Sequence, residues 1–169
     1  MPDDSRDQID SAELQAEARA FRAGFDSVIL ATQGEAGPDA SYAPCLLDDD
    51  EAVCIFVSEL ASHTRNLFGL PRASLLFIEP ESEARNPFAR RRLALQCDVS
   101  EIPRDSDAGG QRLDALRARF GKTVDLLRSL PDFHLLRFDV TDGSYVRGFA
   151  QAYALRGNNL EILQRRTRG

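Results

Sequence analysis

One stretch, Ile55–Pro80, constrains most strongly what this chain can fold into. Apolar residues dominate on both sides of its centre, over Ala52–Val57 and over Ala73–Glu79. Apolar runs of this length that are bounded by polar segments are typical of buried strands. The polar segment between the two runs is interpreted as a turn and a short helix. The stretch therefore predicts a strand, a helix and a second strand.

The beginning of this expected helix has the residue types of an anion site. Free N–H groups and a partial positive charge at a helix N-terminus favour phosphate or carboxylate. An ordinary capped helix on the surface has similar residues, so both interpretations stay open. The residues at or near the helix start are Ser58, Ser62, His63, Thr64, Arg65 and Asn66.

The other strands follow at short spacing, which predicts an antiparallel meander. A turn at residues 141–143 is expected to separate the last two long strands, and residues 160–163 are expected to form a short strand or helix. With six or more strands and few helices, the chain should form a closed or nearly closed barrel. The remaining expected strands are Ser27–Thr32, Ala40–Leu47, Arg90–Ile102, Phe133–Val140 and Ser144–Leu155.

Helical periodicity appears in two further places. Ser11 is expected to cap a helix that runs to about Ala23, with Gly24 as its C-cap. A second apolar stripe, from Leu113 to Leu127, is interrupted at Gly121 and predicts two helices. The strands at 52–57 and 73–78 look buried on both faces. A helix or a second subunit must then cover one face, and a homodimer is the economical prediction.

Length and charge limit the function classes. The chain has 169 residues and a net charge of −6, most of which lies before residue 18. This balance argues against a dedicated nucleic-acid binder. No apolar run approaches the roughly 20 residues that span a bilayer. No signal peptide is visible, so a cytoplasmic protein without a membrane partner is expected. The expected organisation is a disordered acidic segment at 1–10, a single domain at 11–163 and a basic tail at 164–169.

Few residues stand out as catalytic candidates. Cys45, Cys54 and Cys97 lie in apolar segments and are expected to be buried free thiols. His63 is either an anion or metal contact or an exposed surface histidine. His134 alternates with apolar residues and is expected to make a hydrogen bond in the core or at an interface. Other residues considered are Asp132, expected in a turn, and Arg90, Arg91 and Arg92, which suit bidentate contact with a phosphate or propionate.

Several segments resemble a known family. Asn66–Leu67 with Pro71–Phe77 is similar to the flavin-binding split barrel of pyridoxamine 5′-phosphate oxidase and its relatives. The chain resembles the haem-utilisation branch of that superfamily more closely. The segments that carry this resemblance are ASYAPCLLDDD (40–50), FVSELASHTRNL (56–67), EPESEARNPFARRRL (79–93), FGKTVDLLRSLPDFHLLRF (120–138) and GFAQAY (148–153). The resemblance implies a mainly β, α+β fold, a six-stranded antiparallel split barrel with flanking helices.

The resemblance also implies a homodimer with small-molecule ligand grooves at its interface. FMN, in a flavin-dependent oxidoreductase, is the first cofactor expected. Many relatives place a lysine three residues before the Asn–Leu pair, and His63 takes that position here. The residues expected to bind the cofactor are Ser58, His63, Thr64, Arg65, Asn66, Arg91 and Arg92.

Two alternatives to FMN remain open. One is a protein that binds or degrades haem, because relatives in this branch ligate iron with a histidine in the C-terminal segment. Residues 154–169 contain no histidine, so His63 is the candidate iron ligand if haem is bound. The other is a split-barrel module that binds a partner without any cofactor.

Overall fold

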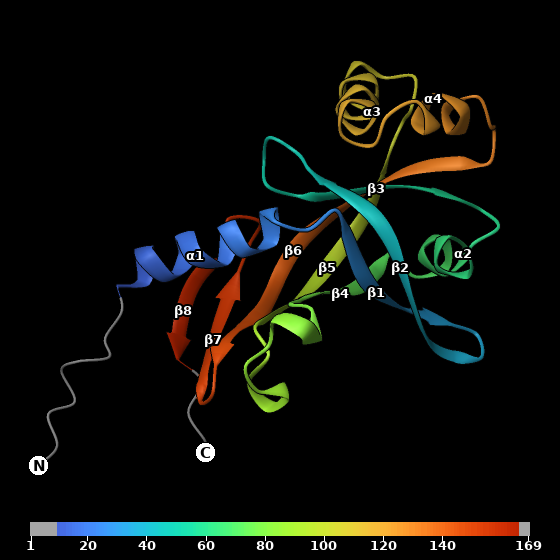
Figure 1. Cartoon of the computed structure of the whole chain (residues 1–169). Coiled ribbons are helices and arrows are strands. Elements are labelled where there is room, and N and C mark those ends of the chain that lie inside the picture. The colour runs from blue at the N-terminus through green and yellow to red at the C-terminus, as the bar shows by residue number, and fades with distance from the viewer. Residues whose placement is uncertain (1–9, 166–169) are drawn as a thin grey trace, which may run out of the picture.

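The computed structural model describes residues 10–165, and its strands form one eight-stranded sheet with helices around it (Figure 1). Most predicted strands are confirmed with small shifts in their bounds. In chain order the elements are α1 (Ser11–Ala23), β1 (Ser27–Gly34), β2 (Gly37–Leu47), β3 (Val53–Ser58), α2 (Ser62–Gly69), β4 (Arg72–Ile78), η2 (Glu81–Glu83), η3 (Pro87–Ala89), β5 (Arg92–Ile102), α3 (Asp107–Phe120), α4 (Thr123–Arg128), β6 (Phe133–Gly148), β7 (Gln151–Arg156) and β8 (Glu161–Arg165).

Six of the strands close into a barrel. The pairing order runs β3-β2-β1-β4-β5-β6, and β6 pairs back onto β3 to complete the ring. All of these pairs are antiparallel. β7 and β8 extend the sheet from the second half of β6, outside the closed ring. The predicted six-stranded antiparallel barrel with flanking helices is therefore confirmed.

The turn predicted at residues 141–143 is wrong. β6 extends from Phe133 to Gly148, with only a shift of its register against β5 at Thr141, and the chain reverses at residues 149–150 instead. A side chain at Gly143 would place its Cβ only 2.5 Å from the carbonyl oxygen of Ala94 on β5. The glycine is needed for a close approach of two strands, and a turn glycine has the same local sequence signal. The predicted strand at 144–155 is consequently divided between β6 and β7.

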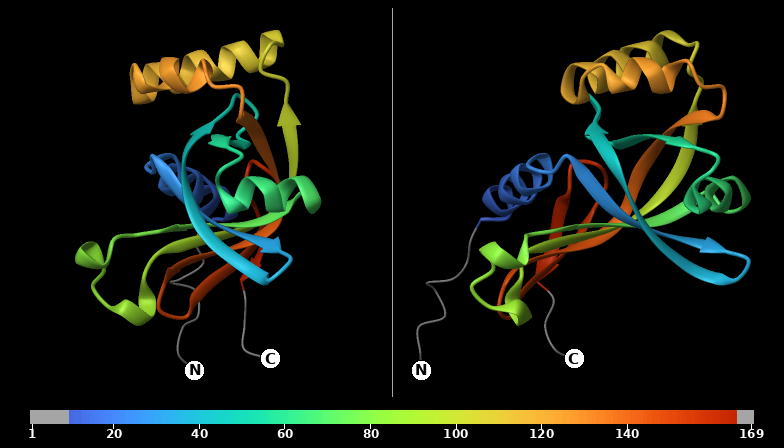
Figure 2. Two further views of the ribbon diagram at one scale, coloured as in Figure 1. Left: turned by 90° about the vertical axis from the view of Figure 1, so that its right-hand side faces the viewer. Right: turned by 45° about the vertical axis from the view of Figure 1, so that its right-hand side comes forward.

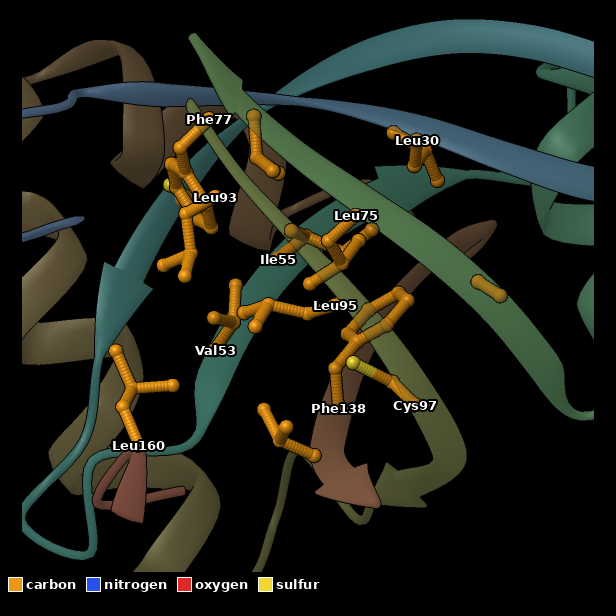
Figure 3. Close-up of a cluster of buried hydrophobic side chains, with 14 of the residues drawn as sticks. Leu30, Val53, Ile55, Leu75, Phe77, Leu93, Leu95, Cys97, Phe138 and Leu160 are labelled. Atoms are coloured by element: carbon orange, nitrogen blue, oxygen red, sulfur yellow. The ribbon is translucent and has the colours of Figure 1, made fainter. Parts of the chain in front are cut away.

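The barrel interior holds the main core. Inward-facing residues alternate along β4 and β5, so every second side chain enters the interior. Figure 3 shows these side chains meeting from several strands. α1 adds to this core from outside the ring, and its N-cap is Asp10 and not Ser11 as predicted. The labelled core residues are Leu30, Val53, Ile55, Leu75, Phe77, Leu93, Leu95, Cys97, Phe138 and Leu160.

The two strands expected to be buried on both faces, β3 and β4, differ in how far their outer faces are covered. On β3, Cys54 and Phe56 point away from the barrel and pack in a second cluster with Leu113, Leu116 and Val124 of α3 and α4. Figure 2 shows these two helices lying together across one end of the barrel. A helix pair therefore covers the outer face of β3. The outer face of β4 is only half-buried.

The two ends of the chain lie largely outside residues 10–165, which are the residues that the structure describes. The acidic segment expected to be disordered is undescribed up to residue 9, and the basic tail from residue 166. The expectation of one domain over residues 11–163 stays a prediction. Within residues 10–165, no helix has both the length and the hydropathy needed to cross a membrane.

Candidate ligand site at the start of helix α2

α2 lies against β1 and β2, beside the barrel (Figure 1). It begins at Ser62, and no side chain caps its first turn from the preceding Ala61. His63 and Thr64 face the protein and are buried, whereas Arg65 is exposed. The predicted helix is confirmed. In its first turn two buried side chains, His63 and Thr64, lie between two exposed ones, Ser62 and Arg65, so these residues do not form a single ligand-facing surface.

A carboxylate of the chain itself occupies the first turn. Ser62 Oγ donates a hydrogen bond of 2.6 Å to Asp39 Oδ2, and Asn66 Nδ2 lies 3.3 Å from the same oxygen. Asn66 Nδ2 also donates to Thr32 Oγ1 at 3.0 Å. A carboxylate is therefore already held beside the first turn of the helix by these two side chains. A second anion at this turn, such as the phosphate of FMN, would meet the negative charge of Asp39.

Arg65 is used to hold the loop that precedes α2. Its Nη1 donates to the carbonyl oxygens of Glu59 at 2.7 Å and Leu60 at 3.0 Å. Both contacts bend the guanidinium back over its own chain. The structure therefore gives Arg65 a role in fixing the entry to the helix.

His63 has the chemistry of a metal ligand but is enclosed. It is only 6% exposed, so the alternative of an exposed surface histidine is wrong. Its Nδ1 lies 2.9 Å from Ser41 Oγ, whereas Nε2 is buried without a hydrogen-bond partner among the described residues. Burial lowers the pKa of His63, and Asp39 partly opposes this effect. A neutral imidazole whose other nitrogen is hydrogen-bonded is the form that ligates metals.

His134 belongs to a different cluster. Its Nδ1 lies 2.7 Å from Glu101 Oε1 and its Nε2 lies 2.7 Å from Glu59 Oε1, and the edge of Phe68 packs against the ring. Burial lowers the pKa of His134, but the hydrogen bonds and charges of the two glutamates outweigh it and raise the pKa overall. The predicted hydrogen-bonded histidine is present. Glu59 and Glu101 were missed because they are distant in sequence.

Ser58 lies beside the His134 cluster and not with His63. Its hydroxyl donates to Asp132 Oδ2 at 2.5 Å, while the Glu59 N–H donates to the Asp132 carbonyl at 2.9 Å. Asp132 lies in the turn before β6, as predicted. These bonds join the end of β3 to the start of β6.

Arg91 and Arg92 are placed far from α2 within one chain. Arg92 pairs with Ile78 at the far end of β4, whereas Arg72, next to α2, pairs with Asp98. With about 3.3 Å of rise per residue, the six positions between Arg72 and Ile78 correspond to roughly 20 Å. The Arg91 guanidinium lies over the Phe21 ring, with its central carbon 4.6 Å from the ring centroid. The expected cofactor residues are therefore divided between two ends of the barrel.

The remaining candidate metal ligands are buried. Cys45, Cys54 and Cys97 are free and buried, as predicted. Burial is the largest influence on each thiol and raises the pKa to about 12, 11 and 12, respectively. No group of three or more histidine, cysteine and carboxylate side chains could hold a metal ion among residues 10–165. The Nε2 of His63 remains a buried nitrogen without a hydrogen-bond partner among these residues.

Comparison with known proteins connects this arrangement to a family. A model of the pyridoxamine 5′-phosphate oxidase family matches residues 14–147. The chain is 38% identical to the haem oxygenase HutZ of Vibrio cholerae over 148 residues, which cover 87% of this chain and 84% of that protein.

Solved structures agree with the sequence match. The crystal structure of HutZ, described as the haem storage protein from Vibrio cholerae, has a TM-score of 0.68 at 36% identity, over 74% of this chain and 88% of that one. Campylobacter jejuni ChuZ has a TM-score of 0.81 at 28% identity, over 92% of this chain and 64% of that one. The chain belongs to the pyridoxamine 5′-phosphate oxidase family, in the branch that contains these haem-utilisation proteins.

Proposed function

We propose that this protein binds haem. The observation that carries the proposal is the 38% identity with a haem oxygenase across 87% of the chain. A structural relative at 25% identity, with a TM-score of 0.74 over 90% of this chain and 60% of that one, is described as a haem-binding protein from Mycobacterium smegmatis. Storage and oxidation both begin with binding, so binding is the property that these names share.

The first turn of α2 favours haem over FMN as the ligand. FMN carries a phosphate dianion, and the expected position for it is beside the carboxylate of Asp39. Removing that repulsion would require the Asp39 carboxylate to move away from the turn. Haem has no phosphate, so it does not need this turn as an anion site.

His63 is the proposed iron ligand. It is one of two histidines in the chain, and the other holds both ring nitrogens 2.7 Å from carboxylates. Ser41 would keep the His63 ring oriented, and burial lowers the pKa of His63, which favours the neutral imidazole; Nε2 can ligate iron when the ring proton is on Nδ1 and is donated to Ser41. Because Nε2 is buried, coordination requires the contacts around α2 to open. Bound haem would supply redox chemistry at iron, and the chain would supply ligation and exclusion of water.

Titration with haemin tests both parts of the proposal. Wild-type protein should give a saturable change in the Soret absorption, and His63→Ala should change that spectrum or weaken binding at least tenfold. His134→Ala is the matched control and should bind as wild type does. Equal spectra for wild type and His63→Ala would exclude His63 as ligand. Binding of FMN with no binding of haemin would restore the flavin interpretation, and binding of neither would leave a cofactor-free module.

We also propose that the protein is a homodimer through the outer face of the barrel. Paired positions on neighbouring strands form an apolar row there, and two of them, Ile29 and Tyr42, are 43% and 69% exposed. The row continues through Leu76 and Ala94. Family members of this fold are expected to place ligand grooves between two copies. Sedimentation should show a dimer that Ile29→Glu dissociates, and a wild-type monomer at micromolar concentration would contradict the proposal.

A further inference from the structure

A pocket at the opposite end of β4 from α2 contains two arginines, Arg85 and Arg91, that form no ion pair among residues 10–165. Its volume is about 300 Å³. It lies between the η2–η3 segment and the hairpin that joins β6 to β7, at the lower part of Figure 1. The lining residues are Glu79, Glu83, Arg85, Asn86, Ala89, Arg91, Arg147 and Gly148.

Some of the charged side chains that line this pocket have an ion-pair partner and others have none. Arg147 is paired with Glu17, with Nε 2.8 Å from Oε2. Glu79 accepts a hydrogen bond of 2.6 Å from the backbone N–H of Arg91, which holds its carboxylate at the main chain. Arg85 and Arg91 form no ion pair with any residue in the described part of the chain. Glu83 lies exposed at the rim and also has no such partner.

Arg91 is held in place before any ligand arrives. Its guanidinium lies over the ring of Phe21, which is itself buried in the core. Its Nε is buried and has no hydrogen-bond acceptor among residues 10–165. A partly buried guanidinium that has no ion-pair partner is costly, and an anion in contact with its Nη groups would offset that cost. A planar, fixed arginine is suited to bidentate contact with phosphate or carboxylate.

Two exposed aromatic residues are sequence neighbours of residues that line the pocket. Phe88 precedes the lining residue Ala89, and Phe149 follows the lining residue Gly148. They are 88% and 74% exposed, which is unusual for phenylalanine in a folded chain. Exposed aromatic rings beside fixed arginines suit a ligand that combines an aromatic body with an anionic group.

We propose that this pocket binds an oxyanion, phosphate or carboxylate, carried on an aromatic body. Arg85 and Arg91 would contact the anionic group, and Phe88 and Phe149 would contact the body. The site is separate from the start of α2, where Asp39 already holds the helix N-terminus. The inference does not depend on haem binding.

Calorimetric titration of the full-length protein at low ionic strength tests this site. The probes are phenyl phosphate and benzoate, with inorganic phosphate as the reference without an aromatic body. Arg85→Ala and Arg91→Met should each weaken phenyl phosphate binding about tenfold, which corresponds to about 1.4 kcal/mol. Two variants are used because Arg91 also packs on Phe21, whereas Arg85 is exposed.

Arg72→Ala is the control with the same change of charge, since Arg72 is exposed at the other end of β4 and faces Asp98 at 3.4 Å. It should bind as wild type does, and Glu83→Gln should tighten binding. Phe88→Ser should remove part of the preference for phenyl phosphate over inorganic phosphate. Binding of benzoate but not phenyl phosphate would identify the oxyanion as carboxylate. Absence of binding by both aromatic probes, or equal losses in Arg72→Ala and Arg85→Ala, would overturn the proposal.

Discussion

The hydroxyl of Ser62 lies 2.6 Å from Oδ2 of Asp39, so a residue of β2 holds the first turn of α2. The contact joins two segments that are 23 positions apart in sequence. It ties the helix to the barrel and places a carboxylate beside the first helical turn. The same contact puts a negative charge where the phosphate of a cofactor was expected.

Replacing Asp39 by asparagine should make the α2 turn accept phosphate. Asparagine still accepts a hydrogen bond from Ser62 but removes the negative charge next to the helix N-terminus. FMN affinity should rise about tenfold, or about 1.4 kcal/mol, relative to wild type. Fluorescence titration measures the affinity. Asp49→Asn, at an exposed position, is the control and should have no effect. Tight FMN binding by the wild-type protein would contradict the argument.

The stability supplied by His134 should depend on pH. Its pKa is raised in the folded protein, so the folded state binds the proton more tightly than the unfolded chain does. This contribution is fully present below the unfolded pKa, near 6.5, and is lost as pH rises through the folded pKa. Because the cluster is partly exposed, the change should be about 1 kcal/mol or less.

Urea unfolding of wild type and His134→Gln at pH 5.5 and pH 9 measures this effect. The difference in the free energy of unfolding should be larger at the lower pH. His63, whose lowered pKa acts in the opposite direction, is present in both proteins and cancels from the difference. Glu101→Gln in the wild-type background should reduce the pH dependence. A difference that is the same at both pH values would show that His134 does not gain a proton on folding.

Gly143→Ala should destabilise the barrel. The added Cβ would lie 2.5 Å from the carbonyl oxygen of Ala94 and 2.9 Å from a methyl carbon of Leu95. Relief of this overlap requires β5 and β6 to move apart, at a cost of about 1–3 kcal/mol. Thermal and urea unfolding measure the loss. Gly110→Ala is the control, because a Cβ there meets no described atom within 4 Å and should stabilise α3 by about 0.5–1 kcal/mol.

Asp48 should be more important for stability than its exposed neighbour Asp50. Its side chain is 3% exposed, and its Oδ2 lies 2.9 Å from Arg112 Nη2 and 2.6 Å from Arg137 Nη1. Asp48→Asn leaves both guanidinium groups without this charge and should cost about 3 kcal/mol.

Asp50→Asn serves as the control for Asp48. Asp50 is 72% exposed and 3.4 Å from Arg137, so its removal should cost about 0.5 kcal/mol or less. Chemical denaturation of the two variants compares them directly. Similar losses would mean that Asp48 does not anchor α3 to the barrel.

Local patterns in the sequence were enough for most of the fold. Alternation along 92–102 and the apolar runs around Ile55–Pro80 identified strands, because a strand buries every second residue or both faces. The same reasoning failed at Gly143. A glycine that permits close strand contact and a glycine that permits a turn have the same local sequence, and only the neighbouring Ala94 distinguishes them.

Local sequence patterns were sufficient to predict the strands along the chain, the helix between β3 and β4, and the resemblance to the family. Which charged groups are paired depends on contacts that form only in the folded barrel. Asp39 reaches Ser62, and Glu59 and Glu101 reach His134, across 23, 75 and 33 positions. Strand periodicity is a local property that each segment carries in its own residues. Ion pairs and hydrogen bonds between distant segments arise only when the barrel closes, so they set the chemistry of the site without leaving a local pattern.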